Sequence, residues 1–315
     1  MTDRPTRDGF GEGVVELGEK RQDIVVLSAD LTESTRAGWF KDKFPERFFS
    51  MGVSEQDMIS TASGLALSGK TPFACTFGVF AAGRAWDQIR VSVAYMNLNV
   101  KIIGTHGGIS VGPDGPTHQA IEEVALMRVL PNMTVIVPCD WLEAKKATIK
   151  CASHNGPVYI RLGRSGSPVL TRPEDPFEIG KAYILREGED VTIMACGNEV
   201  CEALMAHDLL KKEGISSKVI NIHTLKPIDK EAVIKAARET NAIVTAEEHS
   251  VFGGLGSIVS EILAENYPVP IEFIGVKDKF GESGSAKELF KLFGLTAEDI
   301  KEAAKRVIKR KGCKR

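Results

Sequence analysis

Short apolar segments recur along the chain and alternate with stretches whose apolar residues repeat at helical spacing. In the first half, the apolar segments are 24–27, 73–77, 100–103, 135–137 and 158–160, and helical patterns cover 55–68, 80–95, 117–130 and 141–151. Segments in which most residues are apolar, without strict alternation, are typical of parallel strands buried on both faces. The alternation therefore predicts a doubly wound α/β domain with a mainly parallel sheet.

The same alternation resumes in the second half of the chain. Strands are expected at 191–195, 218–222, 242–245 and 271–274, and helices near 198–212, 229–239, 254–265 and 296–310. Between the halves, residues 163–180 are rich in Gly, Ser and Pro, which form neither a helix nor a buried strand. We therefore expect two doubly wound α/β domains, at 1–163 and 187–315, joined by a linker at 164–186.

Composition excludes several classes of partner. The 315 residues include 40 basic and 42 acidic side chains, a balance that favours neither nucleic acid nor an acidic membrane surface. The basic run at 305–315 fits the solvated end of a terminal helix. No stretch approaches the roughly 18 apolar residues of a membrane span, and the polar N-terminus does not resemble a signal peptide. The six cysteines show no CxxC or metal-type spacing, which favours buried thiols in the cytoplasm.

Common nucleotide and hydrolase motifs are missing from the sequence. It contains no GxxxxGK[ST], no GxSxG and no HExxH, and its glycine clusters do not form GxGxxG after a strand. The glycines at 253–256 open a predicted helix, where close packing or a tight turn explains them better than an anion site. Hydrolase and nucleotidase functions therefore lose their main support.

A carboxylate stands at the predicted start of the helix 55–68. In the segment GVSEQDM at 52–58, Ser54 has the position of an N-cap and Glu55 that of the first helical residue. An ordinary cap explains this pattern, because the helix dipole favours a negative charge in the first turn. Apolar residues on both sides also fit a carboxylate held against apolar surface, where its pKa can be raised for chemistry.

Three polar side chains follow the third predicted strand. His106, Asp114 and His118 lie within residues 104–119, which include five glycines, and Thr117 is expected to cap the next helix. Loops at the carboxyl ends of strands line the ligand crevice of a doubly wound sheet, so we expect these groups to converge there. Hydrogen bonds that brace the loop are the alternative to contact with a ligand, and the residues alone leave both open.

Two aromatic residues, Phe77 and Phe80, mark the end of the second predicted strand. Core packing is the usual role of aromatic residues at this spacing. At a strand terminus they can also form the wall of a pocket for a flat heterocycle.

Seven stretches, in this order, resemble the C-terminal half of transketolase, which consists of a pyrimidine-binding domain and a C-terminal domain. They are SADLTES at 28–34, GVSEQDM at 52–58, TFGVFAAGRAWDQ at 76–88, THGGISVGPDGPTHQ at 105–119, LPNMTVIVPCD at 130–140, AEEHSVFGGLG at 246–256 and FGESG at 280–284. The family's Gly-Asp-Gly…Asn element, which holds the metal and the diphosphate, has no counterpart here. The resemblance therefore implies one subunit of a split transketolase that needs a separate partner.

The resemblance implies thiamine diphosphate as the cofactor. Glu55 matches the glutamate that shares a proton with the aminopyrimidine nitrogen and so activates the cofactor. Phe77 and Phe80 match the aromatic wall around the pyrimidine, whereas Gly83 stands where many transketolases have a third aromatic residue. The family's metal ion, Mg²⁺ or Ca²⁺, is held by the diphosphate domain of a neighbouring chain, so this chain alone is expected to bind no metal.

The resemblance also assigns residues to a sugar phosphate substrate. His106 and His118 match histidines that contact its hydroxyl and carbonyl oxygens, and Asp114 matches the aspartate that contacts the hydroxyl next to the carbonyl. Three further residues, Arg7, Ser34 and Arg164, match those that hold the phosphate, and Arg161 competes with Arg164 for this role. Guanidinium groups suit a phosphate because their N–H donors fork onto two oxygens.

The activity implied is transfer of a two-carbon ketol unit from a ketose phosphate to an aldose phosphate, as in pentose phosphate metabolism. The family leads us to expect an N-terminal transketolase subunit as partner, in an α2β2 assembly or with a self-dimer of this chain. The C-terminal domain is expected to serve assembly. Three alternatives are a deoxyxylulose phosphate synthase, the beta subunit of a 2-oxo acid (pyruvate-type) dehydrogenase and a non-catalytic family member. His106 argues against the synthase, which has an Asp-Arg pair at 105–106, and DGPTHQ at 114–119 favours the transketolase.

Overall fold

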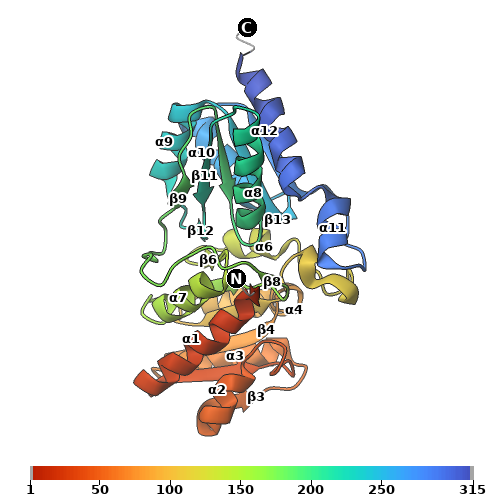
Figure 1. Ribbon diagram of the computed structural model, residues 1–315. Helices are drawn as coiled ribbons and strands as arrows, with labels where there is room; N and C mark the ends of the chain where they lie inside the picture. Colours follow the sequence, from red (N-terminus) through yellow and green to blue (C-terminus); the bar gives the residue numbers. More distant parts are fainter. Residues whose placement is uncertain (1–2, 313–315) are drawn as a thin grey trace.

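The computed structural model describes residues 3–312 as two α/β domains, each built on one sheet (Figure 1). The first sheet has the strand order β12 (Thr224–Lys226), β6 (Thr134–Ile136), β7 (Val158–Arg161), β5 (Lys101–Thr105), β4 (Thr71–Phe77), β2 (Ile24–Ser28) and β3 (Phe48–Ser50). Neighbouring strands are parallel except β12, which is antiparallel to β6. The predicted mainly parallel sheet is confirmed.

Helices cover both faces of this sheet, as a doubly wound fold requires. They are α1 (Thr6–Lys20), α2 (Gly38–Lys43), α3 (Glu55–Leu67), α4 (Gly78–Arg84), α5 (Trp86–Gln88), the π-helix η2 (Ile89–Tyr95), α6 (Glu123–Arg128) and α7 (Trp141–Cys151), with short 3₁₀ helices η1 (Pro45–Arg47) and η3 (Ile109–Asp114). Because side chains alternate along a strand, Ile24 and Val26 share an apolar core with α1 and α7, whereas Val25 and Leu27 share another with α3.

The second sheet has five strands and also carries helices on both faces. Its order is β14 (Ile271–Val276), β13 (Ile243–Ser250), β10 (Val191–Ala195), β11 (Ser217–Asn221) and β9 (Tyr183–Arg186), and its helices are α8 (Glu199–Lys212), α9 (Lys230–Thr240), α10 (Leu255–Asn266), α11 (Ala286–Phe293) and α12 (Ala297–Gly312). Only the edge strand β9 is antiparallel to its neighbour. The helices α8 and α12 cover one face, and α9 and α10 cover the other.

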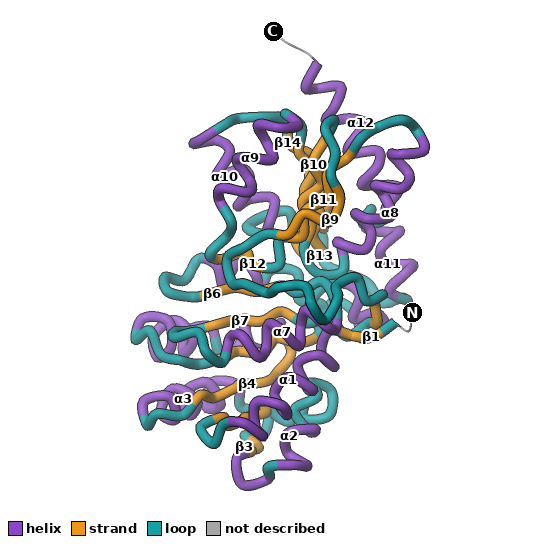
Figure 2. The backbone as a smooth tube through the Cα atoms, turned by 60° about the vertical axis from the view of Figure 1, so that its left-hand side comes forward, coloured by secondary structure: helices purple, strands orange, loops and turns teal. Residues whose placement is uncertain are grey.

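The two domains share structure instead of meeting only through a linker. The strand β12 follows β11 in the sequence, yet it completes the first sheet beside β6 (Figure 2). One buried apolar cluster includes Met127 and Val135 of the first domain and Ile220 and Leu255 of the second. The interval 164–186, expected to be a linker, also contains β9 and the strand β8 (Gly166–Ser167), which pairs with β1 (Arg4–Pro5).

The first helix, α1, was not predicted from the sequence. Its glycines lower intrinsic helix propensity, but they allow close packing. A Cβ at Gly9 would lie 2.0 Å from the Trp141 carbonyl oxygen of α7, and one at Gly11 would lie 2.5 Å from the Trp39 ring of α2. Tertiary packing therefore holds α1 in place, and Arg7 lies in its first turn.

Two predicted helices differ from the structure. The stretch 80–95 is divided among α4, α5 and η2, and the helix expected from 117 begins only at Glu123. Thr117 is therefore not a cap, and its hydroxyl oxygen lies 2.9 Å from Nδ1 of the adjacent His118.

The cysteines within residues 3–312 are free thiols. Cys75, Cys139, Cys151 and Cys196 are buried, and Cys201 is half-buried. Burial raises the pKa of Cys151 to about 12 and that of Cys201 to about 11, which keeps both thiols protonated at neutral pH. Cys313, Lys314 and Arg315 lie outside the described residues.

Candidate active site

The predicted site residues come together at the carboxyl ends of the strands of the first sheet. Glu55 begins α3 shortly after β3, Phe77 ends β4, and His106 directly follows β5. These strands belong to one sheet, with β3 separated from β4 only by β2. The sheet topology therefore collects side chains that are up to 51 positions apart in sequence, counted from Glu55 to His106.

Glu55 is buried at the start of α3, with 4 % of its surface exposed. Ser54 occupies the N-cap position but its side chain makes no cap hydrogen bond. The sequence predicted apolar surroundings for this carboxylate. The structure also places a cation there, because Nη1 of Arg84 donates to Oε1 of Glu55 at 2.9 Å. Arg84 was missed as a site residue: it lies 29 positions away, and only its place in the RAWDQ stretch pointed to it.

The aromatic residues form a wall next to this carboxylate. The rings of Phe77 and Phe80 are stacked with their centroids 5.8 Å apart, and the Arg84 guanidinium lies 4.0 Å from the centre of the Phe80 ring. His106 stacks on Phe77 at 3.7 Å, and His118 presents its edge to Phe80 at 5.6 Å. Four of the predicted residues, from the two stretches 76–88 and 105–119, thus form one continuous group of rings.

Gly83 leaves space beside this wall. Apart from its chain neighbours and the backbone of α4, a Cβ at Gly83 would meet no atom of the described residues within 4 Å. The open space adjoins exposed Arg84, whose main-chain carbonyl accepts a hydrogen bond from the Gln56 side chain at 3.1 Å. The position of the family's third aromatic residue is therefore open in this chain.

Several arginine side chains lie close to His106. Arg7 donates from Nη1 to the main-chain oxygen of Ser34 at 2.8 Å and lies 3.5 Å from Nε2 of His106. Its Nε atom is buried without a hydrogen-bond partner in the described structure. Burial and the positive charge of Arg36 and Arg164 lower the pKa of Arg7 to about 10. A crowded cationic group with an unused donor is suited to bind an anion.

Arg36 belongs to this group although the sequence did not single it out. Its Nε donates to Asp8 at 2.7 Å, and its backbone has φ +68°, which a non-glycine residue seldom adopts. Nothing in its local sequence distinguishes it from a solvated arginine.

The two competing arginines have different surroundings. Arg164 donates to the main-chain oxygen of Val111 at 2.7 Å and to Asp114 at 3.2 Å, and its side chain is 36 % exposed. Arg161 is buried, where it pairs with Glu123 and donates to the Glu248 main-chain oxygen at 2.7 Å. Its donors thus serve the protein interior, and Arg164 is the one available to a ligand.

Burial and nearby cations keep His106 neutral. Burial, reinforced by Arg7 and Arg164, lowers the pKa of His106 to about 3. Its Nδ1 lies 2.9 Å from the Thr105 hydroxyl, and its backbone has φ +58°. A neutral imidazole fixed in this way can exchange hydrogen bonds with hydroxyl or carbonyl oxygens at neutral pH.

The buried His106 is expected to weaken the fold in acid. Between the unfolded pKa of 6.5 and the folded pKa of about 3, the unfolded chain binds a proton that the folded chain does not. Stability from this group is therefore complete above pH 6.5 and lost as the pH falls toward 3, by several kcal/mol at about 1.4 kcal/mol per pKa unit. Urea unfolding of His106→Gln and the wild type should show a smaller acid loss in the variant. Parallel pH profiles would contradict this expectation.

The described residues offer no metal site of their own. Within residues 3–312, no group of three or more His, Cys, Asp or Glu side chains is arranged to hold a metal ion.

Among the same residues, every helix is too short or too polar to cross a membrane.

Comparison with known proteins places the chain in a family. The model "Transketolase, pyrimidine binding domain" matches residues 3–168, and the model "Transketolase, C-terminal domain" matches residues 180–300. The chain belongs to the transketolase family. Its relatives of similar length show that it is the C-terminal section, as found in split-gene transketolases, and thus one subunit of a two-chain enzyme.

Three transketolase relatives illustrate this. A Methanocaldococcus jannaschii protein, whose name describes a transketolase C-terminal section, is 48 % identical over 305 residues, covering 96 % of this chain and 95 % of the relative. A 6-deoxy-6-sulfo-D-fructose transketolase subunit of Clostridium sp. is 46 % identical and covers 97 % and 95 %. A solved split gene transketolase, described as an inactive beta4 tetramer, is 50 % identical with a TM-score of 0.92 and covers 98 % and 99 %.

Proposed function

We propose that this subunit transfers a two-carbon ketol unit from a ketose phosphate to an aldose phosphate. It does so with thiamine diphosphate bound between this chain and a separate N-terminal transketolase subunit. The partner supplies the ligands for Mg²⁺ or Ca²⁺. The observation that carries the proposal is the juxtaposition of buried Glu55, the Phe77–Phe80 wall and two histidines with a cationic group.

The residues of this chain fit the pyrimidine end of the cofactor. A flat heterocycle needs an apolar face and a hydrogen-bonding group at its edge. Phe77 and Phe80 supply the face, Glu55 supplies a carboxylate, and the space at Gly83 leaves room. When bound, thiamine diphosphate would supply the carbon nucleophile that the reaction at the ketose carbonyl needs.

Each side chain has a distinct part in the proposed reaction. Glu55 exchanges a proton with the ring nitrogen of the pyrimidine. His118 and the neutral imidazole of His106 hydrogen bond to the carbonyl and hydroxyl oxygens of the sugar, and Asp114 accepts from the hydroxyl next to the carbonyl. Arg7 and Arg164 hold the terminal anion, with Ser34 fixing Arg7 through its main-chain oxygen.

A coupled assay tests the proposal. Xylulose 5-phosphate and ribose 5-phosphate are supplied with thiamine diphosphate and Mg²⁺, first to this chain alone and then with an N-terminal subunit that carries Gly-Asp-Gly…Asn. Ketol transfer only when both chains are present supports the proposal. Pyruvate decarboxylation without sugar transfer would support a synthase or dehydrogenase, and no reaction with any donor would support a non-catalytic member.

A sugar sulfonate is a second candidate for the terminal anion. The Clostridium relative is named for a sulfo-sugar, and an arginine group can bind either anion. Running the same assay with 6-deoxy-6-sulfofructose as donor separates the two substrates.

Replacing Arg164 by glutamine is expected to weaken binding of phosphorylated substrates. One charge-assisted contact contributes about 1.5–3 kcal/mol, so KM for xylulose 5-phosphate should rise roughly 10- to 100-fold. Steady-state kinetics with phosphorylated and unphosphorylated donors measures the selectivity. Exposed Arg172→Gln is the matched control. Equal effects on both donors would count against a phosphate contact.

The oligomeric state of this chain is part of the proposal. We expect an α2β2 enzyme with the partner and self-association without it, in line with the relative described as a beta4 tetramer. Light scattering on each sample measures the mass.

A further inference from the structure

The loop that carries three of the proposed substrate residues begins at the end of β5 and contains the short 3₁₀ helix η3. We name residues 104–119, with His106, Asp114 and His118, the site loop. Four of its residues have positive φ, namely His106, Gly108, Gly112 and Gly115. A glycine-rich segment of this kind has many accessible conformations, so contacts from outside must select one.

A carboxylate of the second domain provides one such contact. Glu248, on β13, is 2 % exposed, and its Oε1 accepts a hydrogen bond from the Ser110 main-chain N–H at 2.5 Å. Its Oε2 accepts from Asn198 at 3.0 Å, while its main-chain oxygen accepts from Arg161 at 2.7 Å. A Cβ at Gly108 would lie 2.2 Å from Oε1, so the glycine lets the carboxylate reach the loop.

The segment 280–284 of the second domain holds the other end of the site loop. The Gln119 side-chain amide donates to the main-chain oxygens of Ile109 at 3.1 Å and Glu282 at 2.8 Å. A Cβ at Gly115 would lie 2.4 Å from the Ser283 hydroxyl, so the segment packs directly on the loop beside Asp114.

We propose that the second domain sets the conformation of the site loop, with Glu248 as the main positioning residue and Gln119 as its counterpart at the other end. The proposal rests on the proposed function for its effect on catalysis. It gives the C-terminal domain a role beyond assembly, because the loop conformation places Asp114 and His118. Glu248 touches none of the proposed substrate residues and acts only through the loop backbone.

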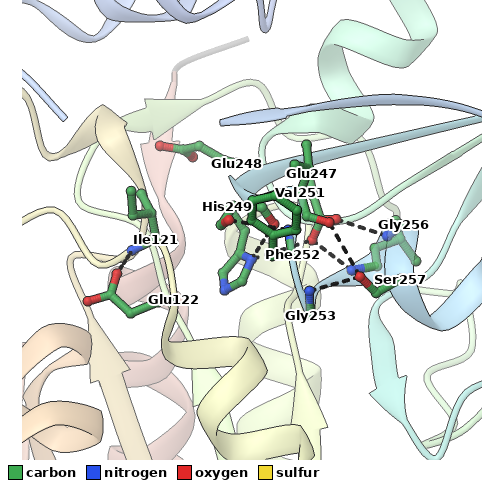
Figure 3. A network of polar contacts seen from close by, with 12 residues as sticks. Ile121, Glu122, Glu247, Glu248, His249, Val251, Phe252, Gly253, Gly256 and Ser257 are labelled. Carbon is green, nitrogen blue, oxygen red and sulfur yellow. Dashed lines mark hydrogen bonds and ion pairs between the residues drawn. The ribbon is translucent and has the colours of Figure 1, made fainter. Parts of the chain in front are cut away.

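The neighbouring Glu247 is a natural control. It is also 2 % exposed, but its carboxylate accepts from the main-chain N–H groups of Leu255 at 2.7 Å and Gly256 at 2.9 Å (Figure 3). The two carboxylates leave adjacent positions of β13 and bind different partners: that of Glu247 binds the start of α10, and that of Glu248 binds Ser110 of the site loop. Glu247 thus stabilises the start of α10, and none of the hydrogen bonds of its side chain within the described residues goes to the site loop.

Hydrogen exchange on the isolated chain tests the proposal without any partner or substrate. In Glu248→Ala, peptides covering 108–118 should exchange about tenfold faster than in the wild type. In Glu247→Ala, exchange should rise at 253–258 and stay unchanged at 108–118. Glu248→Gln keeps an acceptor for the Ser110 N–H, so it should restore slow exchange. If Glu248→Ala does not fold, Gln119→Met tests the other end of the loop. The same increase in the exchange rate at 108–118 is expected.

Kinetics of the two-chain enzyme gives the second readout. For Glu248→Ala, kcat/KM should fall about tenfold or more, because displaced substrate contacts lower the rate, while Glu247→Ala should keep the wild-type value. Unchanged exchange at 108–118 in Glu248→Ala and Gln119→Met would overturn the proposal. A different result would be faster exchange at 108–118 in Glu248→Ala together with no ketol transfer by the wild-type two-chain enzyme. That result would refute the proposed function and leave the positioning role of Glu248 intact.

Discussion

Glu55→Gln is expected to lower ketol transfer by the two-chain enzyme by about 10²- to 10⁴-fold, the usual contribution of a positioned acid–base group. Glutamine preserves the size of the side chain and can still accept the hydrogen bond from Arg84. It cannot exchange a proton with a ring nitrogen. The coupled assay measures the loss, and thermal unfolding checks that the fold survives.

A nearby acid serves as the control for this variant. Asp57 lies two positions further along the first turn of α3 but is exposed. Asp57→Asn should leave turnover near the wild-type value, although it also removes a negative charge from the helix start. Near-normal activity in Glu55→Gln would refute the assignment of Glu55.

Arg161→Gln is expected to lower the free energy of unfolding by about 3–5 kcal/mol, because it leaves the carboxylate of Glu123 buried without its partner. Both side chains are almost fully buried, at 6 % and 1 % exposure. The guanidinium also donates to the main-chain oxygen of Ala120 in its own domain and to that of Glu248 in the second domain. Urea denaturation of the isolated chain measures the change.

A double-mutant cycle separates the ion pair from these backbone contacts. In the variant Glu123→Gln with Arg161→Gln, no unpaired charge remains, so part of the lost stability should return. Glu123→Gln alone should also destabilise. If Arg161→Gln costs less than about 1 kcal/mol, the pair is not a structural centre, and Arg161 returns as a candidate for phosphate binding.

The regular parts of the fold were predictable because buried strands and helices have recognisable patterns of apolar residues. Strands such as β2 and β10 are buried throughout and consist almost entirely of apolar residues, and α7 begins next to Asp140, whose side chain caps it. Where tertiary contacts override local preference, prediction failed. The helix α1 was not predicted because its four glycines lower its helix propensity. The strands β3 and β12 have three residues each, which is too short for a recognisable pattern of apolar residues.

The grouping of the candidate site residues was predictable to the level of individual loops. Strand ends placed Phe77 and His106 together, and the helix start placed Glu55. The partners of these residues were not predictable, since the ion pair of Arg84 with Glu55 depends on how α4 packs beside α3. The same holds for Arg7 and Ser34, which are 27 positions apart, and for the contacts of Glu248 with the site loop.

The position of the strand β12 determines whether the chain can be truncated between its two domains. A fragment ending at residue 163 retains six strands of the first sheet but loses β12, so the main-chain donors and acceptors of β6 become an open edge. Open edges recruit other chains, and such a fragment would tend to aggregate. The complementary fragment would carry residues 224–226 without the sheet that they complete. The polypeptide therefore has two domains in architecture that share one sheet, and truncation at the apparent boundary is expected to damage both halves.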